Sequence, residues 1–396
     1  MRTRPVSVMV GVLMLLAVTA CSGSGEAEEP GGEGDPSPSA APAVEITIAP
    51  EDGATGVATS GALAVSAEHG TLTEVKVTGP EGAEVPGELA EDGTGWQPEE
   101  HLANDTEYTV TAVGENAEGR AATAEAGFTT VPADATFTSN WNLSDGATVG
   151  VGMILSMTFD TPIEDTAAVR DAVSVTTESG TEVRGHWFGT QRLDFRPESY
   201  WEAGTEVDVR FRVRGVEGAP GVYGTLHEDL SFTIGRSQVT TVDAGAKTMK
   251  VVRDGETLRT IPVTTGAAAT PTWNGRMVIT EKHRETRMDG ATVGFGGEYD
   301  IPDVPHAMRL STSGTFIHGN YWAGGATFGS QNVSHGCIGL KDARGAGDSS
   351  TPGAWFYDNS IIGDVVEVIN SDDDIIAPDN GINGWNMDWD EWGAGQ

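Results

Sequence analysis

The chain has 396 residues, with 23 Lys and Arg against 59 Asp and Glu, and its formal net charge is −36 at pH 7. This acidity argues against nucleic acid and anionic lipid surfaces as partners, because both would repel a polyanion. A chain of this length has room for two or three domains.

The N-terminus has the pattern of a secretion signal. Arg2 and Arg4 precede an uncharged apolar stretch at residues 8–18, which is too short for an ordinary membrane span. Small residues then lead to Cys21, and this junction resembles the lipobox of bacterial lipoproteins. The resemblance implies that residues 1–20 are removed and that Cys21 is diacylated, which would anchor the protein to a membrane. The alternative is a plain cleaved signal followed by an incidental cysteine.

Residues 21–43 are predicted to form a disordered tether, because after Cys21 they contain no large apolar residue. The chain has two cysteines, Cys21 and Cys337. If Cys21 carries lipid it cannot pair, so Cys337 is predicted to be a free thiol in an oxidising compartment.

Residues 44–133 and 134–237 are predicted to be two related immunoglobulin-like β-sandwiches. Short stretches of the first module recur in the second, at residues 50–57 and 143–150 and at residues 95–99 and 194–198. Each module has an alternating strand pattern, at 106–113 and 205–213, and closes with a Phe-Thr pair, at 128–129 and 232–233. Short strands between turns, repeated once, are typical of such sandwiches. Neither module contains a catalytic cluster.

Residues 238–370 are predicted to form a β-rich domain, so the whole chain is expected to be mainly β. The Asp254-Gly255 pair predicts a hairpin, and one short helix is expected at 355–358 after Pro352. Residues 371–396 carry Trp385, Trp389 and Trp392, which are predicted to pack this segment against the β-rich domain rather than to bind sugar. Strands are expected at 239–243, 248–253, 256–263, 276–280, 307–311, 315–318 and 364–369.

The sequence places a candidate nucleophile, Cys337, directly after Ser-His-Gly at 334–336, with His318 19 positions upstream. A nearby imidazole can serve as the base for a thiol or convert it to a thiolate–imidazolium pair. Gly336 favours a tight turn, and consecutive N–H groups in that turn can stabilise an oxyanion. The pattern indicates acyl transfer through a thioester.

Other interpretations of these residues stay open. One alternative is that Cys337 is an inert, buried thiol. A zinc site can be drawn from His318, His335 and Cys337, with His306 as a further ligand, but His335 and Cys337 are only two positions apart and a fourth ligand is lacking at metal spacing. The order and spacing of His318 and Cys337 disfavour papain-like and sortase-like enzymes.

The fifteen residues between His318 and Ser334, followed by Ser-His-Gly-Cys, resemble the motif of the L,D-transpeptidases with the YkuD catalytic domain. Stretches at 309–314, 355–359, 363–368 and 384–390 resemble the actinobacterial branch of this family. The order of lipoprotein signal, two immunoglobulin-like domains, catalytic domain and aromatic C-terminal segment resembles it too. The likeness therefore covers almost the whole chain.

The resemblance implies a role for each residue of the motif. Cys337 would be the nucleophile and His318 its base and proton donor, with the imidazole oriented by the backbone carbonyl of Gly319. His335, Gly336 and Cys337 would shape the oxyanion hole, and Ser334 would hold the turn.

The resemblance also implies substrate contacts from Tyr299, on a lid loop, and from Ser313 and Gly314. The family usually has Asn or Arg two residues after the cysteine, where this chain has Gly339. A polar contact to substrate would be lost there, or supplied from elsewhere by Asn320 or Asn332. A Gly- and Ser-rich insertion at 345–353 is a second departure.

Taken together, the resemblance implies a lipid-anchored enzyme on the outer face of the plasma membrane, in the cell-wall space. It would form 3→3 cross-links between peptidoglycan stem peptides, from a tetrapeptide donor to the amine of a diamino-acid acceptor, and carbapenems would acylate it. It would need no metal or organic cofactor. The alternatives are a catalytically impaired wall-binding lipoprotein and a cysteine peptidase or carboxypeptidase acting on the same stem peptides.

Overall fold

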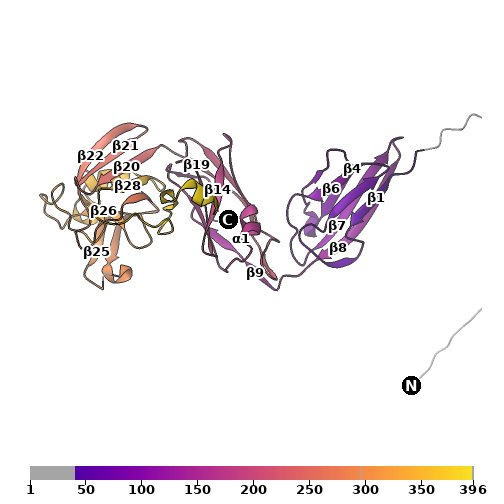
Figure 1. Cartoon of the computed structure of the whole chain (residues 1–396), viewed down its shortest axis with the longest axis horizontal. Helices are drawn as coiled ribbons and strands as arrows, with labels where there is room; N and C mark the ends of the chain where they lie inside the picture. The colour runs from indigo at the N-terminus through magenta and orange to yellow at the C-terminus, as the bar shows by residue number, and fades with distance from the viewer. Residues whose placement is uncertain (1–40, 295, 395–396) are drawn as a thin grey trace, which may run out of the picture. The chain divides into compact units, whose positions relative to one another are not determined.

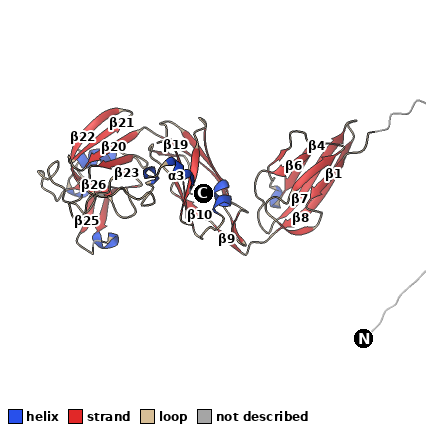
Figure 2. Cartoon of the chain, in the orientation of Figure 1, coloured by secondary structure: helices blue, strands red, loops and turns tan. Residues whose placement is uncertain are grey.

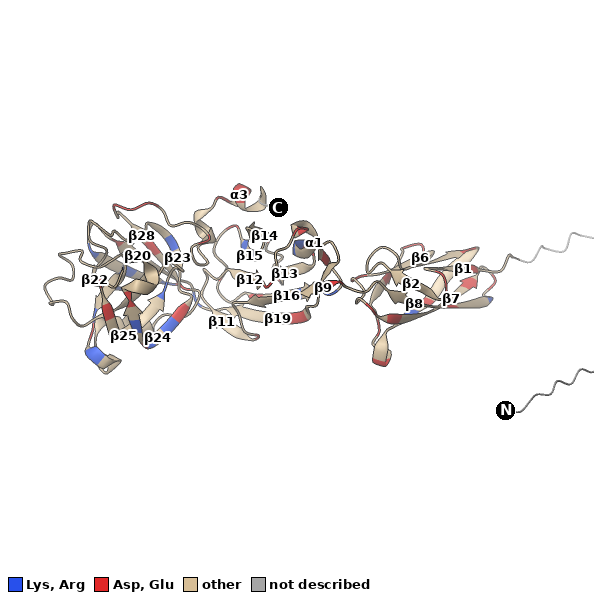
Figure 3. Cartoon of the chain, turned by 90° about the horizontal axis from the view of Figure 1, so that it is seen from below, with Lys and Arg blue, Asp and Glu red and all other residues tan. Residues whose placement is uncertain are grey.

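The computed structural model describes residues 41–294 and 296–394, and these ranges are mainly β (Figures 1 and 2). The predicted signal peptide, Cys21 and nearly all of the predicted tether lie outside the described residues. Within the described part of the chain, none of the helices is both long enough and apolar enough to cross a membrane. In Figure 3 the positions of Asp and Glu, red on the ribbon, occur in both sandwiches and in the domain that follows them.

The first sandwich consists of two four-stranded sheets, with strand orders β1-β3-β6-β5 and β2-β8-β7-β4. Alternate residues of the strand Glu107–Asn116, such as Val110 and Ala112, are fully buried between the sheets. The strands are β1 (Glu45–Ala49), β2 (Ala54–Val57), β3 (Ala64–Glu68), β4 (Gly70–Thr78), β5 (Gly87–Leu89), β6 (Gly95–Pro98), β7 (Glu107–Asn116) and β8 (Ala121–Thr130), with a 3-10 turn η1 (Pro80–Gly82).

The second sandwich has the same plan, with sheets β10-β12-β15-β14 and β11-β19-β16-β13 and a small sheet β17-β18-β9 at its side. Its elements are β9 (Ala135–Phe137), β10 (Ser139–Trp141), β11 (Ala147–Val149), β12 (Leu155–Phe159), α1 (Thr166–Asp171), β13 (Val173–Thr177), β14 (Val183–Phe188), β15 (Arg192–Pro197), β16 (Glu206–Arg212), β17 (Glu217–Ala219), β18 (Val222–Gly224) and β19 (His227–Ile234).

The stretches that recur in the sequence occupy equivalent strands. In the first sandwich β2 pairs in parallel with the last strand, β8, and Ala54 lies opposite Phe128. In the second, β11 pairs in parallel with the last strand, β19, and Ala147 lies opposite Phe232. The repeat therefore encodes the same strand pairing twice.

The following domain is built on one mixed sheet of nine strands, ordered β23-β28-β20-β21-β22-β27-β26-β25-β24. The Asp254-Gly255 turn joins β21 to β22, and both residues have positive φ, as the hairpin prediction requires. The elements are β20 (Gln238–Asp243), β21 (Thr248–Arg253), β22 (Glu256–Thr264), β23 (Gly275–Val278), β24 (Glu281–Asp289), η2 (Gly290–Val293), β25 (Asp300–Arg309), β26 (Phe316–Asn320), β27 (Ile338–Lys341), η3 (Arg344–Ala346), α2 (Pro352–Asp358) and β28 (Val365–Ile369).

Two elements of this domain differ from the sequence prediction. β24 was not expected, because its sequence, EKHRETRMD, has no apolar alternation and most of its side chains are partly or fully exposed at the edge of the sheet. Helix α2 begins earlier than expected, at Pro352, where Pro occupies the first helical position and Thr351 caps the helix by accepting a hydrogen bond from the Ala354 N–H.

The C-terminal segment, with η4 (Gly384–Asn386) and α3 (Trp389–Ala394), packs on the nine-stranded domain, with Ile376 in that domain's core, and also on the second sandwich, which was not predicted. Its tryptophan rings contact the second sandwich: Trp392 stacks on His186 with ring centroids 4.8 Å apart, and the guanidinium of Arg196 lies 4.4–5.3 Å from the rings of all three tryptophans. The rings go there because β14 and β15 offer an aromatic and cationic surface. Hydrogen bonds between Asn386 and the backbone of Arg276 hold the segment to the nine-stranded domain as well.

The second sandwich and the nine-stranded domain share a hydrophobic core. One cluster of buried side chains joins residues of the second sandwich to Val278, Val365, Ile382 and Trp385. Backbone hydrogen bonds from Gly150 to Ile362 and from Gly152 to Gly363 join the same two regions. The sandwich is therefore packed as part of the unit that holds the catalytic candidates.

Candidate active site

Two neighbouring parallel strands bring the catalytic candidates together. β26 carries His318, and β27 begins one residue after Cys337; in the register between them Ile317 lies opposite Ile338 and His318 opposite Gly339. The turn that ends in the cysteine therefore lies beside the strand that carries the imidazole. The connection between these two parallel strands brings together two residues that are 19 positions apart in the sequence.

The environment of His318 fixes its tautomer. The side chain is buried, and its Nδ1 lies 2.8 Å from the carbonyl oxygen of Gly319. Since a carbonyl can only accept, Nδ1 carries the proton and Nε2 is left as a proton acceptor. The indole of Trp322 stacks on the imidazole, with centroids 5.7 Å apart and planes at 20°. Burial lowers the pKa of His318, so the ring is neutral at pH 7.

Cys337 is a half-buried free thiol whose Sγ donates to the carbonyl oxygen of Gly314 over 3.7 Å. Burial raises the pKa of this thiol to about 11. The resting site therefore holds a neutral thiol and a neutral imidazole rather than a thiolate–imidazolium pair, because burial disfavours both charged forms. The proton must then leave the sulfur as the substrate is attacked.

Ser334 holds the turn before the nucleophile. Its Oγ donates to the carbonyl oxygen of Cys337 over 2.6 Å and accepts from the Gly336 N–H over 3.2 Å. Gly336 has φ +106°, a conformation that side-chain-bearing residues rarely adopt. Because the Gly336 amide is already bonded to Ser334, it would have to leave that bond to stabilise an oxyanion.

A cavity of about 340 Å³ opens at Cys337. Apolar side chains, among them Met288 and Ile301, form part of its wall. A largely apolar cleft with a few convergent polar groups is the usual form of a small-molecule site. It is lined by six of the residues predicted from the sequence, namely Tyr299, His318, Ser334, His335, Cys337 and Gly339.

Tyr299 and His335 lie together on one side of the cavity, with ring centroids 5.1 Å apart. His335 Nε2 is 3.0 Å from a carboxylate oxygen of Glu298. Burial raises the pKa of Tyr299 to about 12, so its hydroxyl keeps its proton at neutral pH and can donate to a substrate.

Ser313 and Gly314 do not belong to the wall of this cavity, and their contacts with substrate stay a prediction. Gly314 contacts the thiol through its carbonyl oxygen. Ser313 is hydrogen-bonded to Asn380 of the C-terminal segment. The pair thus supports the nucleophile from a neighbouring turn.

Gly339 has no room for a side chain. A Cβ at this position would lie 2.8 Å from Cγ2 of Thr264 and 3.4 Å from Nδ2 of Asn320. Asn320 lines the cavity and accepts the N–H of Ala323 through Oδ1, which leaves Nδ2 beside the space in question. Gly339 itself has no side chain, but the amide group of Asn320 lies next to it. Asn332, the other candidate, instead bonds the backbone of Thr265 and Ala244.

The ligands considered for zinc do not form a metal site, although His318, His335 and Cys337 line one cavity. Among residues 41–294 and 296–394, three or more His, Cys, Asp or Glu side chains nowhere converge as a metal site would require. His306 is buried and pairs with Asp342, with Nδ1 and Oδ2 2.8 Å apart.

Sequence reasoning missed the apolar part of the cavity wall. Of these residues Trp322 and Val333 are the large side chains left most open, with 44% and 47% of their surfaces exposed. Large apolar side chains left this exposed beside a catalytic motif indicate a binding surface. Their positions next to His318 and Ser334 in the sequence were the available signal, but only the fold shows that they face the same cavity.

Comparison with known families agrees with this geometry. Residues 237–368 match the L,D-transpeptidase catalytic domain family, YkuD, and residues 54–217 match the bacterial Ig domain family, Big_10. The first match contains the whole candidate site. The second covers most of the two sandwiches.

Curated relatives extend the likeness to most of the chain. L,D-transpeptidase 2 of Mycobacterium tuberculosis (strain CDC 1551 / Oshkosh) is 33% identical over 357 residues, which are 89% of this chain and 84% of that protein. L,D-transpeptidase 5 of Mycobacterium tuberculosis (strain ATCC 25618 / H37Rv) is 33% identical over 89% of this chain and 76% of that protein. The solved structure of the L,D-transpeptidase LdtMt1 in complex with imipenem is 29% identical, with a TM-score of 0.49, over 58% of this chain and 97% of that chain.

Proposed function

The chain belongs to the L,D-transpeptidase family, and on that premise we propose that it joins peptidoglycan stem peptides by 3→3 cross-links through a thioester on Cys337. The observation that carries the proposal is the shared cavity of Cys337 and His318, in which the imidazole has its unprotonated nitrogen available as a base. Membership of the family indicates the class of enzyme, and the cavity contains a thiol and an imidazole suited to the reaction.

Acylation begins when a tetrapeptide stem lies in the cavity. Nε2 of His318 takes the thiol proton as Cys337 Sγ forms a bond to the carbonyl carbon of the third residue. The tetrahedral intermediate then collapses, the C–N bond to the terminal D-Ala breaks, and the imidazolium gives its proton to the leaving amine. Backbone N–H groups of the turn at 335–337 stabilise the oxyanion, that of Gly336 after it leaves its bond to Ser334, and the Tyr299 hydroxyl donates to the bound peptide.

Transfer to the acceptor reverses these steps. The side-chain amine of a diamino acid on a second stem attacks the thioester carbonyl and loses a proton to His318. The C–S bond breaks, the thiol regains its proton, and a new amide joins the two stems. Neither a metal nor an organic cofactor takes part in any step.

The site of action follows from the N-terminus. We propose that Cys21 is lipidated and that the protein is held at the outer face of the plasma membrane, where peptidoglycan is made. We also propose that carbapenems acylate Cys337, because their strained carbonyl reacts with the same nucleophile without needing an acceptor.

The deciding experiment uses a soluble form lacking residues 1–43, incubated with purified disaccharide-tetrapeptide and followed by mass spectrometry. The proposal expects a dimer whose mass is that of two monomers less one D-Ala, and Cys337→Ala should give none. Tripeptide without dimer would identify a carboxypeptidase instead. No product from a protein whose Cys337 can still be alkylated would identify an impaired wall-binding protein.

The protonation state of the site has its own test, the rate of Cys337 alkylation by iodoacetamide as a function of pH. Only the thiolate reacts, and burial raises the pKa of Cys337 to about 11. The rate should therefore keep rising between pH 7 and pH 10, by about tenfold for each pH unit. A rate that is already high and flat from pH 6 to pH 8 would instead show a thiolate–imidazolium pair.

A further inference from the structure

The C-terminal segment reaches the catalytic turn through one side chain, Asn380. Its Oδ1 accepts hydrogen bonds from the Ser313 N–H and the Thr312 hydroxyl, each over 2.9 Å, and its Nδ2 donates to the Ser313 hydroxyl over 2.9 Å. One amide thus makes three bonds to a turn that lies 67 positions earlier in the sequence. The Leu310 N–H closes this turn between β25 and β26 by donating to the Thr315 carbonyl oxygen, and the Asn380 bonds add support from another segment of the chain.

The same turn also contacts Cys337. The residue after Ser313 is Gly314, whose carbonyl oxygen accepts the Cys337 thiol over 3.7 Å. Gly314 has φ +96°, a backbone conformation that mainly glycine adopts, and the orientation of its carbonyl group depends on this conformation. A shift of Ser313 would therefore move the acceptor that orients the sulfur.

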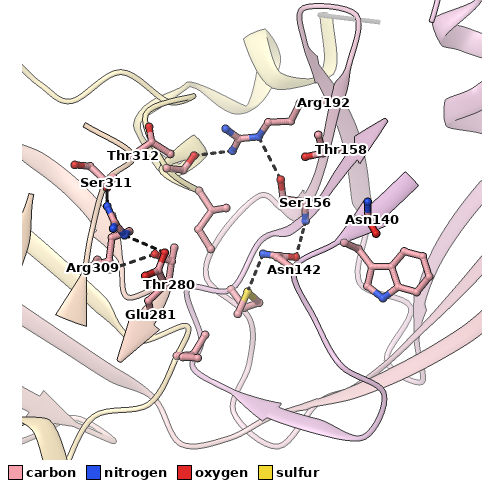
Figure 4. A pocket seen from close by; sticks show the side chains of 15 residues that line it. Asn140, Asn142, Ser156, Thr158, Arg192, Thr280, Glu281, Arg309, Ser311 and Thr312 are labelled. Carbon is pink, nitrogen blue, oxygen red and sulfur yellow. Dashed lines mark hydrogen bonds and ion pairs between the residues drawn. The ribbon is translucent and has the colours of Figure 1, made fainter. Parts of the chain in front are cut away.

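The other end of the connection is Arg192, on β15 of the second sandwich. Its guanidinium donates to the carbonyl oxygens of Asp379 and Gly381, over 2.8 and 2.6 Å, and these residues flank Asn380 on both sides. Arg192 is itself fixed by a two-pronged pair with the buried carboxylate of Asp194, over 2.9 and 2.6 Å. Figure 4 shows Arg192 and Thr312 on the wall of one cavity between the sandwich and the catalytic domain.

We propose that Arg192 and Asn380 are positioning residues for Cys337, through which the second sandwich sets the orientation of the thiol. Neither residue touches the substrate. Arg192 holds the segment around residue 380, Asn380 holds Ser313, and the Gly314 carbonyl holds the sulfur. The proposal rests on the proposed function for its meaning in catalysis, but the orientation of the thiol can be measured without turnover.

The first test is Asn380→Leu, which keeps the approximate size of the side chain and removes all three hydrogen bonds to the turn. Placement errors near a reacting atom lower rates strongly, so kcat for cross-linking should fall by about 10- to 100-fold while KM changes little. The rate of Cys337 alkylation by iodoacetamide at fixed pH should change as well. Asn380→Asp keeps the acceptors for Ser313 and Thr312 and should restore most of both rates.

The matched control is Asn386→Ala. Asn386 ties the same segment to the backbone of Arg276 with two hydrogen bonds but has no connection to the turn. It should lower thermal stability about as much as Asn380→Leu and leave kcat and alkylation near those of the wild type. Equal losses of rate in the two variants would overturn the proposal, as would wild-type rates in Asn380→Leu.

A double-mutant cycle tests the link to the sandwich. Arg192→Lys keeps a charge beside Asp194 but loses the fork that binds two carbonyls. If the two residues act in one chain, the double variant should be no slower than Asn380→Leu alone. Independent, additive losses would overturn the role of Arg192. An alkylation rate that depends on Asn380 in a protein without cross-linking activity would keep the positioning role and reject the proposed function.

Discussion

The two sandwiches repeat one fold but relate differently to the rest of the chain. The first has a hydrophobic core made only of its own residues, from Val44 to Phe128. The second shares its core with Val278, Val365 and Trp385 from beyond its own boundaries. The first touches the second mainly through polar contacts, such as the hydroxyl of Thr59 with the carbonyl of Gly215. The comparison teaches that one copy of a repeated domain can remain a spacer while the other becomes part of the catalytic unit.

A glycine of the second sandwich lies at its contact with the catalytic domain. Val57, opposite Thr130 in the first sandwich, corresponds to Val149, opposite Ile234 in the second, and both side chains are buried. The residue after Val149 is Gly150, and a Cβ there would lie 2.4 Å from the backbone of Gly363 and Asp364. The missing side chain lets the catalytic domain approach the backbone of the second sandwich.

The largest effect is expected from removing a whole sandwich. A chain of residues 134–396 should fold and keep the alkylation rate of Cys337, because the first sandwich has its own core. A chain of residues 238–396 should be unfolded or aggregated, because Val278, Val365 and Trp385 would lose the surface that buries them. Circular dichroism and thermal melts of both chains provide the measurement. A well-folded 238–396 chain would contradict the shared core.

Substitution of one tryptophan in each core should sharpen the contrast. Trp385→Ala should lower the free energy of unfolding by about 3–5 kcal/mol and reduce Cys337 alkylation, since Trp385 is buried and its Nε1 donates to the carbonyl of Gly152. Trp96→Ala should unfold the first sandwich at lower denaturant and leave alkylation unchanged. Loss of alkylation in Trp96→Ala would show that the first sandwich also supports the site.

Gly150→Ala tests the close approach of the two backbones. The added methyl group would force residues 363–364 away, at a cost of about 1–3 kcal/mol. Urea denaturation should show the loss, and Gly95→Ala offers a comparison in the first sandwich, where φ is not left-handed and the nearest atom to an added Cβ is 3.8 Å away. Equal losses in both variants would mean that the contact at Gly150 adds nothing.

The smallest effect is expected at the polar junction between the sandwiches. Although burial opposes its ionisation, hydrogen bonds from His227 and Arg212 together lower the pKa of Glu100. A carboxyl group with a lowered pKa stabilises the folded contact above its unfolded pKa and loses that stabilisation as the pH falls through the folded value. Acid should therefore loosen this junction by about 0.2–1 kcal/mol, and Glu100→Gln should do so at pH 7. Small-angle scattering would detect the motion, and Cys337 alkylation would be unaffected.

Local pattern determined much of this protein. Alternation and recurrence predicted both sandwiches, Asp254-Gly255 predicted a hairpin, and the His318 and Cys337 spacing predicted the family, because each signal lies in a few adjacent residues. β24 escaped prediction because an edge strand needs little apolar alternation. The roles of the individual site residues stay predictions until the variants are measured.

Only the tertiary structure decided how distant segments meet. Burial keeps His318 and Cys337 neutral, which the spacing of the two residues cannot reveal. The partner of the tryptophan rings depends on a surface formed by β14 and β15, about 200 residues upstream. Asn380 and Ser313 are likewise joined only by the packing of the C-terminal segment. Such contacts depend on shape and desolvation summed over the whole fold, and no short stretch of sequence carries that sum.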